Sequence, residues 1–181
     1  MRVNSTKIPG LVVLEPAIFP DERGFFLETW NARAFQDSLK LDVQFVQDNH
    51  SRSARNVLRG LHYQIKHPQG KLIHVSRGRV FDVAVDLRKS SRGFGRWVGV
   101  EISEDNHRQL WVPPGCAHGF LVQSEIADVL YKTTDYYAPS DERCLIWNDP
   151  KLAIDWPLDG EPVLSAKDRS GRPLSEAEVF A

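Results

Sequence analysis

The sequence has few cysteines, no long apolar run and no excess of charge of either sign. Its 181 residues include only Cys116 and Cys144, too few for a disulfide framework and typical of a reducing compartment. No apolar stretch approaches the roughly 20 residues of a membrane-spanning helix, and residues 1–10 lack the apolar segment of a signal peptide. Lys and Arg number 23 against 24 Asp and Glu, which argues against general nucleic-acid binding. We therefore expect a cytoplasmic protein that uses neither a membrane nor nucleic acid.

The chain is organised as one domain over residues 1–181. Hydrophobic residues make up 41% and charged residues 26%, which matches globular proteins and leaves disorder as a poor description. No repeat, low-complexity stretch or Gly/Pro-rich linker divides the sequence. Short apolar segments alternate with polar residues instead, as in 80–87, where Phe81, Val83 and Val85 fall on one face and Asp82 on the other.

The alternating segments predict an all-β fold with one or two short helices. Further strands are expected at 11–19, 25–30, 44–50, 58–64, 71–76, 97–102, 109–112, 118–123 and 128–135. A helix is expected over 31–39, with Asn31 as its N-cap, and a second helical turn near 175–179. Many short strands with almost no helix predict a jelly-roll β-sandwich or barrel.

Polar side chains gather on two of these strands. Gln47, Asn49 and Ser51 share one face by the two-residue period, so they predict an amide-lined wall. Arg59 and His62 lie three residues apart and point to opposite faces, unless the glycine between them forms a bulge that re-aims one of them. The alternative is that His62 is a structural histidine and Arg59 a surface charge.

A metal site is not expected. Residues 113–120 contain a Pro-x-Gly-x-x-His turn that resembles the second motif of the cupin superfamily, where the histidine often binds a metal. The first cupin motif usually offers His-x-His and then a glutamate, but residues 62–64 read His-Tyr-Gln with no acidic residue after them. Since a metal needs about three or four ligands, His62 and His118 do not suffice.

Two further segments carry groups that could act in chemistry. Tyr131, Thr133 and Asp135 share a strand face, and a tyrosine phenol can donate a proton. The alternative for such a tyrosine is an aromatic at the edge of the core, and Tyr137 could stack on a ligand or simply pack. The charged segment 164–169 reads as a solvated tail, and no spacing argument places Asp168 near another group.

Over almost its whole length, the sequence resembles the dTDP-4-dehydrorhamnose 3,5-epimerase family. The resemblance is carried by DERGFF at 21–26, QDNHS at 47–51, LRGLHYQ at 58–64, QGKL at 69–72, GRVFDV at 78–83, PGCAHGF at 114–120, WNDP at 147–150 and LSAKD at 164–168. It implies a cupin-like jelly roll without metal or cofactor, which forms homodimers. It also implies inversion of C3 and C5 of dTDP-4-dehydro-6-deoxy-D-glucose, giving dTDP-4-dehydro-L-rhamnose.

The resemblance assigns roles to particular residues. His62 is expected to remove the protons beside the C4 ketone, with Asp168 orienting its ring. Lys71 is expected to stabilise the enolate oxygen, and Tyr131 to return a proton from the opposite face. Further substrate contacts are expected from Arg23, Glu28, Gln47, Asp48, Asn49, Arg59, His118, Glu142 and Lys167, and thymine stacking from Phe19 and Tyr137. Arg23 and Glu28 are expected to reach the site from the neighbouring subunit.

Three alternatives remain open on the sequence. A relative that inverts only C3 or only C5 would keep the same base and acid. A catalytically silent cupin that binds a nucleotide sugar would have no reason to keep His62, Lys71, Tyr131 and Asp168 together. A metal-dependent cupin oxygenase is a remote third possibility, because the ligand set is missing.

Overall fold

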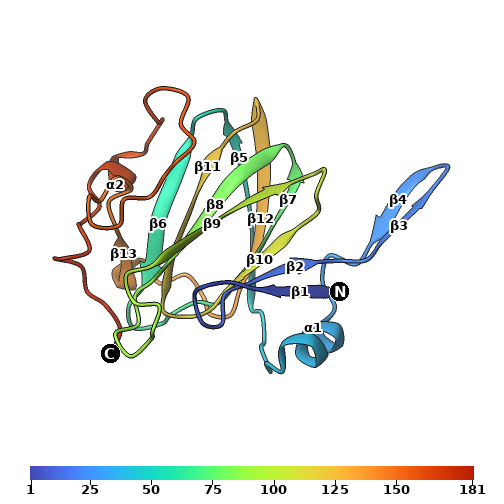
Figure 1. Cartoon of the computed structure of the whole chain (residues 1–181), viewed down its shortest axis with the longest axis horizontal. Helices are drawn as coiled ribbons and strands as arrows, with labels where there is room; N and C mark the ends of the chain where they lie inside the picture. Colours follow the sequence, from blue (N-terminus) through green and yellow to red (C-terminus); the bar gives the residue numbers. More distant parts are fainter.

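Two antiparallel sheets dominate the computed structural model, which describes residues 1–181 (Figure 1). The six-stranded sheet contains, in order, β1 (Arg2–Ser5), β2 (Val12–Glu15), β10 (Gln109–Val112), β7 (Lys71–Arg77), β12 (Ile126–Thr133) and β5 (Gln47–Ala54). The five-stranded sheet contains β13 (Glu142–Cys144), β6 (Leu58–Gln64), β11 (Cys116–Val122), β8 (Arg79–Asp86) and β9 (Trp97–Ser103). The all-β, cupin-like jelly-roll prediction is confirmed.

The remaining elements lie outside these two sheets. They are the hairpin of β3 (Ile18–Asp21) and β4 (Gly24–Leu27), the helices α1 (Ala32–Leu39) and α2 (Ala166–Arg169), and the 3-10 turn η1 (Pro139–Asp141). Figure 1 shows the hairpin projecting away from the sheets, and α2 beside β6. No helix of the chain has the length and apolar character needed to cross a membrane.

The five-stranded sheet is buried on both of its faces. Val80 and Ala84 of β8 belong to one apolar cluster, whereas Val83 and Val85 belong to a second cluster with residues of the C-terminal segment, such as Trp156. The C-terminal segment therefore covers the outer face of this sheet, which carries Val83 and Val85. Asp82 and Asp86 lie on the face of Val80 and Ala84, which packs toward the six-stranded sheet, and are fully buried there, although the alternation of 80–87 marks them only as the polar face of a strand.

The predicted helix at 31–39 is confirmed, and so is its cap. The side-chain oxygen of Asn31 accepts a hydrogen bond from the backbone N–H of Ala34 at 3.1 Å, which satisfies one free donor of the first turn. The prediction near 175–179 is wrong: this segment is a turn followed by extended chain, because Phe180 forms a β-bridge with Arg88. The second helix is α2, where Ser165 accepts a hydrogen bond from the N–H of Asp168 at 3.2 Å.

The predicted strand at 11–19 is two strands in two different sheets. β2 pairs with β1 and β10, whereas β3 pairs only with β4. Pro16 lies between them, and proline cannot donate a hydrogen bond to a sheet. The short edge strands β1 and β13 were missed, because three or four residues carry too little alternation to be recognised.

Candidate active site

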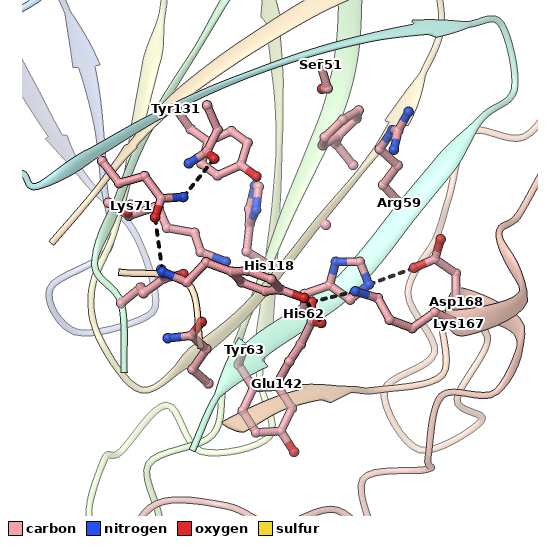
Figure 2. Close-up of a pocket in the computed structure, with 18 of the residues that line it drawn as sticks. Ser51, Arg59, His62, Tyr63, Lys71, His118, Tyr131, Glu142, Lys167 and Asp168 are labelled. Carbon is pink, nitrogen blue, oxygen red and sulfur yellow. Dashed lines mark hydrogen bonds and ion pairs between the residues drawn. The ribbon is translucent and has the colours of Figure 1, made fainter. Parts of the chain in front are cut away.

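A polar cavity of about 430 Å³ is lined by strands of both sheets and by α2 (Figure 2). It brings together residues that are as far apart in the sequence as Gln47 and Asp168. The residues predicted from the sequence that line it are Gln47, Asn49, Arg59, His62, Lys71, His118, Tyr131, Tyr137, Glu142, Lys167 and Asp168. The alternative that His62 is a structural histidine and Arg59 a surface charge is therefore less favoured than a role in this site.

Four predicted contacts lie outside this cavity. Asp48 is exposed on the other face of β5, where it binds the amine of Lys132 at 2.8 Å, so the alternation that turns Gln47 and Asn49 inward turns Asp48 away. Asp48 therefore does not line this cavity, and its contact with the substrate stays a prediction. Arg23 lies on the projecting hairpin and pairs with Asp21. The other two, Phe19 and Glu28, line a separate pocket of about 120 Å³ beside α1.

A bulge in β6 places Arg59 and His62 in the same cavity. The pairing of β6 with β11 shifts register between His118 and Phe120, and Gly60 has a φ of 110°, a conformation that side chains other than glycine rarely adopt. Of the two possibilities left open by the sequence, the bulge is therefore the one observed.

Replacing Gly60 with alanine is expected to destabilise the fold by about 2–4 kcal/mol. An added Cβ would lie 2.6 Å from the backbone of both His118 and Gly119, in addition to the strained φ. Gly160→Ala is the matched control, because Gly160 also has a positive φ of 81° but nothing within 4 Å of its Cβ position. We expect it to cost about 1 kcal/mol. Urea unfolding would measure both, and equal losses would mean that the close approach at Gly60 is unimportant.

His62 and Asp168 form a pair at one wall of the cavity. The Nε2 atom of His62 lies 2.7 Å from Oδ1 of Asp168, although somewhat off the direction of an ideal hydrogen bond. This contact leaves Nδ1 as the ring nitrogen available to a ligand. The pair resembles the base–orienter arrangement of many proton-transferring enzymes.

Asp168 is held in place by its own contacts. Its Oδ1 accepts a hydrogen bond from the backbone N–H of Gly60 at 3.1 Å, and its Oδ2 accepts one from the hydroxyl of Ser165 at 2.6 Å. Burial alone would raise the pKa of Asp168, but the contacts with His62, Ser165 and Gly60 outweigh it and lower the pKa. Asp168 therefore stays ionised and can stabilise a protonated His62.

One trio of side chains could offer metal ligands. Atoms of His62, Cys144 and Asp168 lie within 4.8 Å of one another. Both oxygens of Asp168 are already engaged, however, and burial raises the pKa of the Cys144 thiol to about 12. Since a metal binds the thiolate, this donor set fits a His–Asp pair better than a metal centre.

A second polar cluster lies near the mouth of the cavity. Glu142 accepts hydrogen bonds from the amine of Lys167 at 2.6 Å and from the hydroxyl of Tyr137 at 2.8 Å. Burial opposes ionisation of Glu142, but these hydrogen bonds prevail and lower its pKa. Gln47 accepts a hydrogen bond from the backbone N–H of Tyr137 and donates one to Asn49, which fixes the amide wall against the same loop.

Arg59 and Lys71 are the two cations of the cavity that no carboxylate contacts. Arg59 donates to the hydroxyl of Ser53 at 2.9 Å, and the amine of Lys71 makes no hydrogen bond or ion pair within the chain. Burial lowers the pKa of Lys71 to about 8, although Glu142 and Asp82 partly oppose the shift. The cavity therefore offers positive charge to a ligand, although the whole chain has a net charge of −1.

Tyr131 lies on β12, in the sheet opposite to the one that carries His62 (Figure 2). Burial raises the pKa of its phenol, while Arg59 opposes the rise. The phenol is therefore protonated at neutral pH and able to donate. A base on one wall and an acid on the other are the arrangement that inversion of a carbon centre requires.

His118 and Asp82 form a second His–Asp pair in this region, which sequence reasoning missed in part. The Nε2 atom of His118 lies 2.8 Å from Oδ1 of Asp82, and both side chains are buried. The sequence marks Asp82 only as part of an alternating strand, and Ser165 only as part of a charged tail. Both residues lie in blocks that carry the family resemblance, GRVFDV and LSAKD, but the resemblance assigned neither of them a role in the site.

The chain is similar to known proteins over almost its whole length. The family described as dTDP-4-dehydrorhamnose 3,5-epimerase matches residues 5–176. The dTDP-4-dehydrorhamnose 3,5-epimerase of Pseudomonas aeruginosa is 57% identical over 180 residues, covering 99% of each chain. The crystal structure of a dTDP-6-deoxy-D-glucose-3,5-epimerase from Legionella pneumophila, in complex with dTDP-4-keto-L-rhamnose, has a TM-score of 0.95 at 50% identity, covering 98% of this chain and 94% of that one.

A more distant similarity concerns an enzyme of narrower action. A 3'-monoepimerase from Streptomyces bikiniensis, in complex with dTDP-quinovose, has a TM-score of 0.89 at 34% identity, covering 94% of this chain and 86% of that one. The shared fold therefore does not by itself separate double from single inversion.

Proposed function

Because the chain belongs to the dTDP-4-dehydrorhamnose 3,5-epimerase family, we propose that it inverts C3 and C5 of dTDP-4-dehydro-6-deoxy-D-glucose to give dTDP-4-dehydro-L-rhamnose. The observation that carries the proposal is the placement of His62 and Tyr131 on opposite sheets around one cavity. Residues 1–181 would act as one catalytic domain in the cytoplasm, which agrees with the two free thiols, Cys116 and Cys144.

His62 acts as the base in this mechanism. Protons on the carbons beside a ketone are acidic, because the resulting carbanion delocalises onto the ketone oxygen. His62 takes such a proton through Nδ1, and the carboxylate of Asp168 stabilises the imidazolium that forms. Exchange of that proton with solvent empties His62 before the next transfer.

Lys71 and Tyr131 complete the reaction. The ammonium of Lys71 faces the C4 oxygen and stabilises the enolate, where a charge in a buried site acts strongly. Tyr131 then returns a proton to the carbon from the opposite wall, and its phenolate takes up a proton from solvent before the next inversion. Removal from one face and return to the other invert the centre.

The nucleotide part of the substrate would be held by the remaining polar residues. Arginine and lysine suit a diphosphate, so Arg59 and Lys167 are expected to contact it. The amides of Gln47 and Asn49 offer donors and acceptors to the sugar hydroxyls, together with His118. Tyr137, half-exposed at the mouth, is placed to stack on the thymine, with Glu142 holding its hydroxyl.

We expect the rate to fall as the pH rises through about 8, where Lys71 loses its charge. The ammonium is the active form, so activity is present below this pKa and lost above it. Tyr131 stays protonated through the same range, because burial raises its pKa. Lys71→Met is expected to lower kcat about 100-fold. It should also abolish the fall in rate at high pH, the alkaline limb of the pH–rate profile, as measured by initial rates from pH 6 to about pH 10.

Lys132→Met is the matched control, because Lys132 lies on the outward face of the same sheet and binds Asp48. It should keep the native pH profile. An alkaline limb that persists in Lys71→Met would remove Lys71 from this role.

We further propose that the working unit is a homodimer with shared sites. The β3–β4 hairpin exposes Phe19, Phe25 and Phe26 by 59%, 60% and 67%, a solvent-exposed apolar surface that favours association. Arg23 lies in the turn of this hairpin and Glu28 directly follows β4, and neither residue lines the cavity of its own chain. The hairpin would deliver them, with Phe19, to the partner's cavity.

Mixing two inactive variants tests the shared site. In a dimer of His62→Ala with Arg23→Ala, one cavity carries both changes and the other carries neither. After subunit exchange, about a quarter of the cavities should be intact, and activity should recover to that level. Recovery near zero, with mixed dimers present by native mass spectrometry, would show that each cavity uses its own Arg23 or none.

The function itself is tested by incubation with dTDP-4-keto-6-deoxyglucose in D₂O, followed by NMR. Deuterium at both C3 and C5 with inverted configuration is the expected result. Entry at one carbon only would support the monoepimerase reading, and entry at neither would support a silent nucleotide-sugar-binding cupin.

A further inference from the structure

Asp82 is a fully buried carboxylate whose hydrogen bonding is incomplete. It lies on β8, on the side that also carries the apolar cluster of Val80 and Ala84. Its Oδ1 contacts Nε2 of His118, but its Oδ2 has no partner within the chain. Burying an unpaired carboxylate oxygen costs stability. An apolar residue would pack there at lower cost, so a functional reason for Asp82 is needed.

The first consequence of Asp82 concerns His118. An ionised carboxylate only accepts hydrogen bonds, so the 2.8 Å contact requires the proton to be on Nε2 of His118. Nδ1 makes no hydrogen bond within the chain, and when the ring carries one proton Nδ1 has a lone pair. Figure 2 shows His118 among the side chains around the cavity, so its Nδ1 can accept a hydrogen bond from a substrate hydroxyl.

The second consequence concerns Lys71. Lys71 is buried and lines the cavity, its amine makes no hydrogen bond within the chain, and burial favours the neutral form. The charged groups that act on its amine are Glu142 on β13, Asp82 on β8 and Lys167 on α2. The other titratable side chains that line the same cavity are Arg59, His62, His118 and Tyr131. Glu142 acts most strongly of these in favour of the charged amine, although it also binds Lys167 at 2.6 Å. Asp82 acts in the same direction, and it contacts His118 but no Lys or Arg.

We propose that Asp82 is a positioning residue for the reaction: it holds the ring of His118 through Nε2, which leaves Nδ1 to accept a hydrogen bond from the substrate, and with Glu142 it supplies negative charge that acts on Lys71. The inference rests on the proposed epimerisation, in which Lys71 must be charged to stabilise the enolate. Asp82 acts through these two side chains and touches no reacting atom.

The first test needs no variant and no substrate. ¹⁵N NMR of the native protein should show the neutral ring of His118 protonated at Nε2. Protonation at Nδ1 would overturn the proposal. This result does not depend on the activity of the protein, so it separates failure of this inference from failure of the proposed function.

The second test compares Asp82→Asn with Asp86→Asn. Asp86 is equally buried on the same face of β8, but it binds Arg88 and Ser91 outside the cavity. For Asp82→Asn we expect kcat to fall about tenfold, KM to change less than about twofold, and the alkaline limb to move down by about half a pH unit or more. Asp86→Asn should lower thermal stability and leave the alkaline limb in place.

The rate of Lys71 acetylation as a function of pH, followed by mass spectrometry, measures the titration of Lys71 without an activity assay. The midpoint of this titration should move to lower pH in Asp82→Asn and stay in place in Asp86→Asn. An unchanged Lys71 titration in Asp82→Asn, or an equal shift in both variants, would overturn the proposal.

Discussion

Replacing His62 with alanine is expected to lower the epimerisation rate about 10³-fold, the usual contribution of a general base. His62 combines a ring nitrogen that has no partner within the chain with the carboxylate of Asp168, which stabilises the protonated ring. Deuterium uptake at C3 and C5 should be lost with the same factor. NMR in D₂O measures uptake, and calorimetry with dTDP should show nearly native binding, because the nucleotide contacts remain.

His50→Ala is the matched control for this loss. His50 lies on the outward face of β5 and contacts Asp128 at 3.2 Å, so it shares the chemistry of a His–Asp contact without access to the cavity. It should keep the native rate. Native-like exchange in His62→Ala would remove His62 from the role of base, and loss of dTDP binding would show that the substitution damaged the site as a whole.

Replacing Tyr131 with phenylalanine is expected to separate exchange from inversion. The ring stays and only the hydroxyl is removed, so His62 can still take a proton and return a deuteron to the same face. Deuterium uptake should therefore continue with retained configuration, whereas formation of the inverted product should fall about 100-fold or more. NMR of the sugar in D₂O reports both quantities in one experiment.

Tyr136→Phe should behave like the native protein, because Tyr136 is 65% exposed and lies outside the cavity. If uptake and inversion fall by the same factor in Tyr131→Phe, Tyr131 does not act as the acid on the second face. It would then contribute to binding or to enolate stabilisation instead.

Local features of the site could be predicted from the sequence. The face shared by Gln47, Asn49 and Ser51 follows from the two-residue period of a strand, and all three line the cavity. The same period explains why Asp48 lies outside the cavity, since the family resemblance named the residue but alternation turns it outward. The bulge at Gly60 was one of two readings that the sequence left open.

Contacts between distant segments could not be predicted from spacing. Asp168 bonds to Gly60 across 108 residues, and only the family resemblance connected it with His62. Asp82 pairs with His118 across 36 residues, because β8 and β11 are neighbours in the sheet. Such pairings depend on the strand order, which alternation within one segment does not specify.

The central claim is that one cavity holds two proton-transferring groups on opposite walls. The ratio of deuterium uptake to inversion, measured in D₂O for the native protein, His62→Ala and Tyr131→Phe, tests it most directly. The account predicts coupled uptake and inversion at C3 and C5 in the native protein, loss of both in His62→Ala, and a ratio raised by about 100-fold in Tyr131→Phe. An unchanged ratio in Tyr131→Phe, or uptake that survives in His62→Ala, would contradict the account.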